Sequence, residues 1–124
     1  MKKDDLVQEI SALLVADPKI SSEPWVHLVI VAQVMPTSLR VNGFAYMDNG
    51  DANPTGPRNL DVLDRFEELR ASMRDPGKEA WKACLLTIDR PAGSVSIDFE
   101  YDHPEKWLVT PATSEQMAER LRPR

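Results

Sequence analysis

The chain of 124 residues is 42% hydrophobic and 28% charged, which is typical of a folded globular domain and unlike a disordered segment. This length suffices for one hydrophobic core, so we expect a single domain over residues 1–124. The formal net charge of −5 argues against direct binding to nucleic acid or to an anionic membrane surface, since both require clustered lysine and arginine, and it favours a basic protein partner.

The N-terminal segment predicts a helix. Apolar residues recur at steps of three and four from Leu6 to Leu14, after Asp4 and Asp5 and before Pro18. The same acids interrupt the apolar region that a secretion signal needs, and no run of about 18 apolar residues occurs along the chain. We therefore expect no secretion, no membrane insertion and a cytoplasmic location.

Two strands are predicted next. Residues 24–36 are rich in β-branched residues, and apolar residues occupy both the odd and the even positions. This pattern predicts a strand covered on both faces. A second strand begins near Leu39 and ends near Met47. Asp, Asn, Gly and Pro then predict a loop over residues 48–58.

A helix and a hairpin follow. An apolar face over residues 60–73 predicts the helix, which ends at Asp75-Pro76-Gly77. The segments 80–89 and 93–102 predict a β-hairpin, and the single cysteine, Cys84, is expected to pack inside it as a small apolar residue. Thr113 and Gln116 have the spacing of a capping box, which predicts a short C-terminal helix.

Together these elements predict an α+β fold of order α-ββ-α-ββ-α. The two hairpins are expected to form one four-stranded antiparallel sheet, with helices packed on one face. A fifth strand would arise if residues 106–110 extended the sheet.

The most distinctive stretch is "SVSIDFEYDHPEKW", residues 94–107. Strand alternation sends Val95, Ile97, Phe99 and Tyr101 to one face and Asp98, Glu100 and Asp102 to the other, where the acids stand about 6.6 Å apart. These unpaired acids predict a docking surface for a basic partner. The alternative is a solvated strand edge that resists unwanted pairing. The predicted contacts are Asp98, Glu100, Asp102 and Glu105, with Trp107 as an aromatic anchor and with Asp48 and Asp51 as a flank.

Catalytic and metal chemistry are weakly supported by the sequence. A metal site built from Asp98, Glu100, Asp102 and His103 is a minor alternative, because their spacing follows strand alternation and is not that of a ligand loop. The chain has no phosphate-binding glycine loop and no HExxH motif, and no nucleophile lies in a known catalytic motif. We therefore predict no catalytic residues, no metal and no cofactor.

The order of elements and several aromatic and acidic segments resemble the YezG-like family of bacterial immunity proteins. The similar segments are "PWVHLVIVAQV", "VNGFAYMDNG", "LRASMRDPGKEAWKACLLTID" and "GSVSIDFEYDHPEKW", which together span most of the chain. The C-terminal arginines Arg120, Arg122 and Arg124 depart from this likeness, and the sequence assigns them no role.

The resemblance implies an immunity protein or antitoxin that is not an enzyme. Such a protein binds one cognate toxin domain, often a nuclease, and blocks its active site or substrate groove. We expect a monomer or weak homodimer with a basic toxin as its partner. The alternative is a small cytoplasmic enzyme or ligand-binding domain with a site between the sheet and the loop 48–58.

Overall fold

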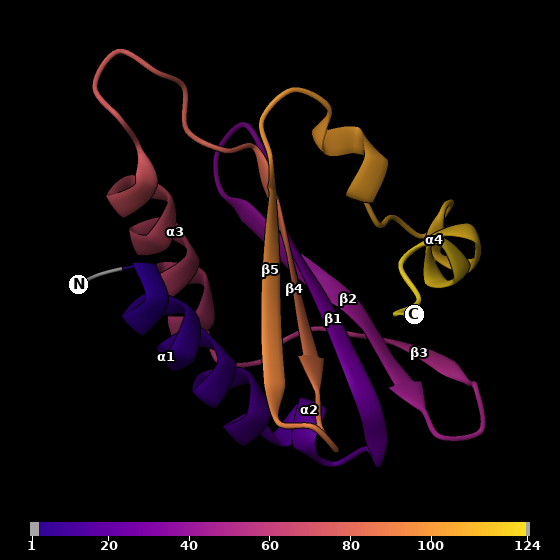
Figure 1. Ribbon diagram of the computed structural model, residues 1–124. Coiled ribbons are helices and arrows are strands. Elements are labelled where there is room, and N and C mark those ends of the chain that lie inside the picture. The colour runs from indigo at the N-terminus through magenta and orange to yellow at the C-terminus, as the bar shows by residue number, and fades with distance from the viewer. Residues whose placement is uncertain (1–2, 124) are drawn as a thin grey trace.

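A five-stranded antiparallel sheet forms the middle of the computed structural model, which describes residues 3–123 (Figure 1). Its strands lie in the order β3-β2-β1-β4-β5. The strands are β1 Trp25–Val34, β2 Leu39–Met47, β3 Ala52–Thr55, β4 Ala83–Asp89 and β5 Ser94–Glu100. The helices are α1 Lys3–Ala16, α2 Pro18–Ser21, α3 Asp61–Met73 and α4 Ser114–Arg120, with a 3-10 helix, η1, at Pro104–Trp107. The predicted α+β class and antiparallel sheet are confirmed.

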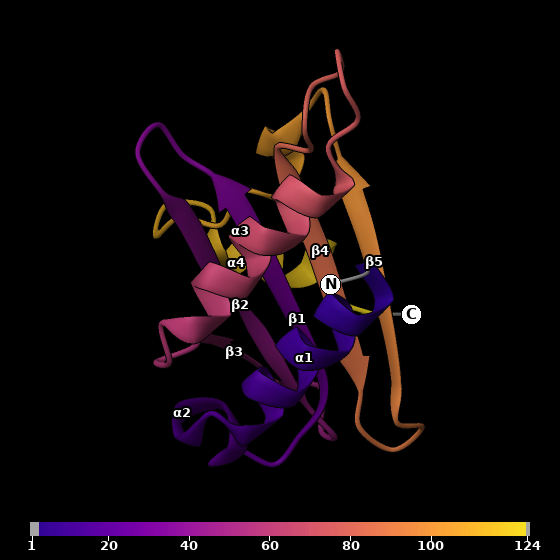
Figure 2. The ribbon, with the colours of Figure 1, turned by 90° about the vertical axis from the view of Figure 1, so that its left-hand side faces the viewer.

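Helices α1 and α3 lie side by side over one face of the sheet, as Figure 2 shows. Their apolar stripes pack against alternate side chains of β1, β4 and β5, as the periodicity of both helices requires. The largest fully buried side chains in this layer are Trp25, Trp81, Phe66, Leu6, Ile10 and Leu14. No helix within residues 3–123 has both the length and the apolarity needed to cross a bilayer.

The C-terminal segment covers the opposite face of the sheet, which differs from the expectation of helices on one face (Figure 1). The reason lies in β1 and β2, which carry apolar side chains on both faces of the sheet. Without the C-terminal segment, the apolar side chains of this second face would be exposed to water. The buried residues of this second layer are Val29, Val31, Phe44, Tyr46, Val109, Met117 and Leu121. The prediction that the first strand is covered on both faces is thereby confirmed.

The fifth strand is β3, and residues 106–110 do not extend the sheet. β3 falls inside the segment predicted as a loop and pairs with β2, so that Pro54 lies opposite Phe44 at the edge of the sheet. Proline is tolerated there because an edge strand leaves half of its N–H groups without a strand partner. The predicted capping box at Thr113 is absent, since its hydroxyl bonds to Thr110 and Leu108 and does not cap α4.

Candidate partner-binding surface

β5 has the alternation that its sequence predicts. Val95, Ile97 and Phe99 pack against the core beneath α1, while Asp98 and Glu100 lie on the other face of the sheet. Among the described strands, β5 lies at the edge of the sheet and pairs with β4 alone, where Asp98 lies opposite Leu85. The acidic residues of β5 therefore lie at an edge of the sheet. The strand itself is at the front of Figure 1.

Glu100 is not available to a partner, contrary to the expectation that the acids of this face are unpaired. Its carboxylate lies 2.5 Å from Lys106 Nζ and accepts the backbone N–H groups of Asp102 and His103, each at 3.1 Å. The ion-paired hydrogen bond with Lys106 and these two backbone bonds lower the pKa of Glu100 to about 2. Glu100 thus links the turn after β5 to η1 and stabilises the fold at this point.

The other predicted acids of this stretch remain exposed. Asp98 and Asp102 form no ion pair within residues 3–123. Glu105 Oε1 lies 3.4 Å from Nδ1 of His103, but both side chains are mostly exposed, and water weakens such a pair. Asp98, Asp102 and Glu105 are therefore open to a charged partner.

The exposed aromatic residue of this region is Tyr101, and Trp107 is only partly accessible. Trp107 lies in η1, packs against the second core layer beside Val109 and has Lys106 Nζ at 5.0 Å from its ring centroid. Tyr101 is 42% exposed. β5 ends at Glu100, so the strand alternation that would have placed Tyr101 on the buried face no longer applies to it. Sequence reasoning missed Tyr101 because it extended the strand two residues past Glu100, to Asp102.

A second segment brings further acids to this end of the sheet. The α3–β4 loop meets the turn after β5 at an open hollow of 470 Å³, lined in part by Asp75, Glu79, Tyr101 and Asp102. Lys78 also lines this hollow, and Glu79 lies 3.5 Å from Lys82, so Asp75 and Asp102 are the acids of the hollow that form no ion pair among residues 3–123.

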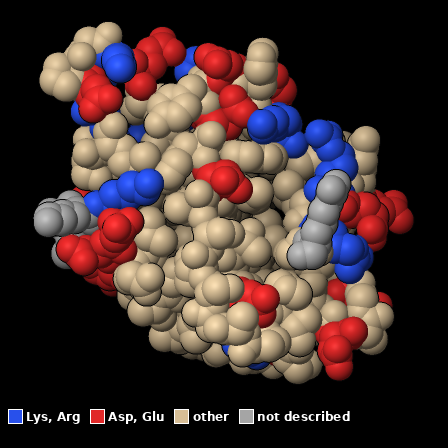
Figure 3. All heavy atoms as spheres, viewed as in Figure 1, with Lys and Arg blue, Asp and Glu red and all other residues tan. Residues whose placement is uncertain are grey.

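We call this region the acidic corner and define it as Asp75, Asp98, Tyr101, Asp102 and Glu105. In Figure 3, charged side chains of both signs gather at the top, over the α3–β4 loop and the turn after β5, while the surface below them is mostly uncharged.

Asp48 and Asp51 lie far from the acidic corner. Both are exposed in the turn between β2 and β3, at the sheet edge opposite to β5. The strand register also places that turn near the Ser94 end of β5, whereas the corner lies near the Glu100 end. The two aspartates are thus at the diagonally opposite corner and do not flank the acids of β5.

β3 turns part of the loop 48–58 into the edge of the sheet, which the alternative prediction of a site beside this loop did not foresee. A hollow of 630 Å³ does lie at this place, between β3 and α4, and Gly50, Asp51, Ala52 and Pro54 of the segment line it together with Phe44 of the sheet. His27 is half-buried on β1, with Nε2 3.5 Å from Asp89, and does not line that hollow. Within residues 3–123, no group of three or more His, Cys, Asp or Glu side chains is arranged to hold a metal ion.

The basic C-terminus lies near this second hollow and is partly neutralised. Arg122 pairs with Glu119 at 2.9 Å, and its guanidinium lies 5.2 Å from the ring centroid of Tyr46. Arg120 is exposed, and Arg124 lies outside the described residues.

No protein-family model and no curated protein matches this chain. The resemblance to the YezG-like family therefore stays a prediction.

Proposed function

We propose that this chain is a cytoplasmic immunity protein that binds and neutralises a basic toxin domain, such as a nuclease, through the acidic corner. The observation that carries the proposal is the exposed Tyr101 beside Asp75 and Asp102, two acids that form no ion pair in the part of the chain that the structure describes. The net charge of −5 and the resemblance to the YezG-like family support it.

The physical basis is electrostatic complementarity around an aromatic anchor. A nuclease is basic where it contacts phosphate, so acids with no internal partner attract that surface and speed the encounter. An amphipathic tyrosine that leaves water on binding concentrates affinity at the centre of such an interface. Inhibition then requires only that the immunity protein cover the groove of the toxin, and no catalytic residue or cofactor takes part.

The partner to test is the C-terminal domain encoded by the neighbouring gene. We expect that domain to be basic, to co-purify with this chain and to lose its toxicity when the two are expressed together. A neighbouring gene without a toxin-like domain, or a domain that does not bind, would contradict the proposal.

Charge reversal tests the surface. Asp75→Lys with Asp102→Lys should slow association with the toxin domain by about tenfold at low salt and flatten its salt dependence. The matched control is Asp48→Lys with Asp51→Lys, which changes the net charge equally at the opposite corner. Equal effects from the two pairs would show that only net charge matters, and full protection by the Asp75/Asp102 variant would show that the surface is wrong.

A further inference from the structure

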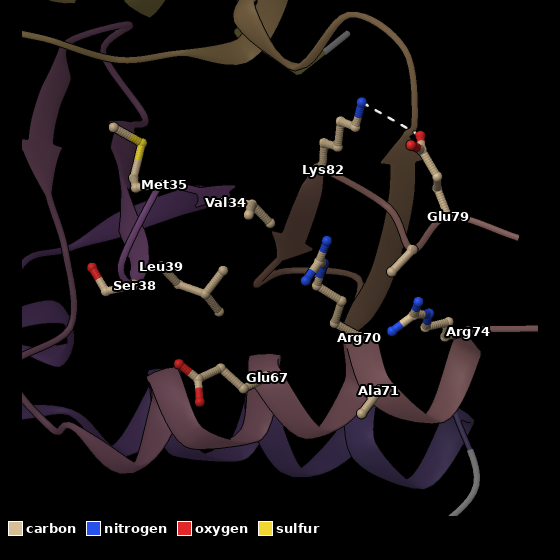
Figure 4. Close-up of a pocket in the computed structure, with 11 residues that line it drawn as sticks. Val34, Met35, Ser38, Leu39, Glu67, Arg70, Ala71, Arg74, Glu79 and Lys82 are labelled. Atoms are coloured by element: carbon tan, nitrogen blue, oxygen red, sulfur yellow. Dashed lines mark ion pairs between the residues drawn. The ribbon is translucent and has the colours of Figure 1, made fainter.

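The largest of the three hollows described here lies at another place in the fold and carries positive charge. It has a volume of 750 Å³ and is bounded by the turn between β1 and β2, the C-terminal half of α3 and the segment before β4 (Figure 4). The charged side chains that line it are Glu67, Arg70, Arg74, Glu79 and Lys82.

Two of these cations have no anionic partner among residues 3–123. Lys82 Nζ lies 3.5 Å from Glu79, whereas neither Arg70 nor Arg74 forms an ion pair in the described part of the chain. The arginines are four residues apart at the end of α3, a spacing at which like charges repel. In Figure 4, Arg70 projects into the hollow and the guanidinium of Arg74 lies on the Arg70 side. An anion between them would relieve the repulsion.

Arg70 is held in place for such a contact. Its Nε donates a hydrogen bond to the carbonyl oxygen of Trp81 at 2.6 Å, and its guanidinium lies 6.0 Å from the centroid of the buried Trp81 ring. The Nη groups of Arg70 donate no hydrogen bond to protein within residues 3–123. A fixed guanidinium with free Nη groups loses little conformational freedom when it binds a carboxylate through two hydrogen bonds.

The rest of the hollow determines the shape of the ligand. Val34, Met35 and Leu39 supply apolar surface, and Met35 can adapt its side chain to a tail of variable shape. Glu67 lies on the side toward Ser38 and Leu39, away from the guanidinium of Arg74 (Figure 4). Its negative charge disfavours a second anionic group at that end.

We infer that this hollow binds a small organic monoanion, with its carboxylate between Arg70 and Arg74 and its apolar part against Val34, Met35 and Leu39. This site goes beyond the proposed immunity function and does not depend on it. A carboxylate attached to an apolar group occurs both in a free aliphatic acid and in the C-terminal residue of a peptide.

Titration with three six-carbon probes tests the site, with the Arg Nε–Hε resonances of the full-length protein as the readout. Hexanoate should shift the Arg70 and Arg74 resonances saturably, with a dissociation constant near about 1 mM or below. Hexanol lacks the charge and adipate carries a second one, so each should bind at least about tenfold more weakly. N-acetylleucine identifies the source: tighter binding than hexanoate indicates a peptide terminus, and weaker binding indicates a free acid.

Variants separate binding from folding. Arg74→Gln changes an exposed side chain and should weaken hexanoate binding about tenfold. Arg70→Lys keeps the positive charge but loses the planar guanidinium that donates two parallel hydrogen bonds, and it should weaken hexanoate binding by a similar factor. The control Lys19→Gln with Arg120→Gln removes two exposed positive charges elsewhere and should leave binding unchanged. The inference is overturned if hexanoate and hexanol bind equally, if neither arginine resonance shifts, or if Arg74→Gln binds hexanoate as the wild type does.

Discussion

The carboxylate of Asp17 joins three segments of the fold, and its removal should destabilise the protein strongly. The side chain is 2% exposed at the junction of α1 and α2. Its Oδ1 accepts the backbone N–H of Lys19 at 3.0 Å, and its Oδ2 accepts those of Arg58 and Asn59 at 2.7 and 2.9 Å. The segment that leads into α3 is thereby fixed to the end of α1.

The magnitude follows from these hydrogen bonds. Asp17→Ala removes a charged acceptor and leaves up to three backbone N–H groups without it, each costing about 1–3 kcal/mol when no replacement is available. Water can reach some of these partly buried donors, so we expect a total loss of about 3 kcal/mol in the free energy of unfolding. Asp17→Asn keeps the shape and one oxygen acceptor, and should cost less than Asp17→Ala.

Urea denaturation followed by tryptophan fluorescence measures this loss. With an m-value of about 2 kcal/mol per molar, the midpoint of Asp17→Ala should fall by about 1.5 M with m unchanged. Asp48→Ala, which removes an exposed acid in the β2–β3 turn, is the matched control and should leave the midpoint nearly unaltered. A midpoint for Asp17→Ala that equals that of the control would refute the reasoning.

The same residue predicts a pH dependence. Burial opposes ionisation of Asp17, but hydrogen bonds from the backbone N–H groups of Asn59, Arg58 and Lys19 outweigh it, and the pKa of the carboxyl lies below its ordinary value. A carboxyl group whose pKa is lower in the folded state stabilises that state at every pH above the pKa of the unfolded chain. This stabilisation is lost as the pH falls through the pKa of the folded state. The stability gap between wild type and Asp17→Ala should therefore narrow in acid, and a gap independent of pH would contradict this assignment.

Three further results are expected. Gly43→Ala should abolish folding or lower stability by about 3 kcal/mol or more, since an added Cβ would lie 1.8 Å from the carbonyl oxygen of Val29; a circular-dichroism melt like that of wild type would contradict it. Cys84 should resist alkylation in the folded protein and react in urea, because burial raises the pKa of its thiol; rapid labelling of the native protein, measured by mass, would show otherwise. The Glu100 carboxyl should titrate near pH 2 by NMR and closer to its ordinary value in Lys106→Ala; an unchanged midpoint in that variant would show that the ion pair does not hold the pKa down.

Much of the secondary structure could be predicted from the sequence because it depends on local periodicity. The apolar steps of α1 and α3 and the alternation in β5 each report which side of an element is buried. β3 was missed because it is short and contains Asn53 and Pro54, which have turn propensity and occur in a strand only at an edge. That edge arises from the pairing of β2 with β3, which a propensity does not encode.

The candidate site could be predicted only in part. The acids Asp98, Asp102 and Glu105 are exposed as the alternation and the polar turn indicated. The neighbouring Asp75 could not have been assigned, since it comes to Asp102 only because the α3–β4 loop meets the turn after β5. The sequence of neither segment contains a pattern that indicates that the other segment lies beside it.

The sequence by itself determined the class of fold, the apolar faces of its helices and strands, and the excess of negative charge. The tertiary structure alone decided which charges are neutralised: Glu100 forms an ion pair with Lys106, while Arg70 and Arg74 line a hollow and form no ion pair within the described residues. The physical reason is range. Periodicity acts between residues a few positions apart, whereas ion pairing and burial depend on distances between segments that only the packed sheet and helices bring together.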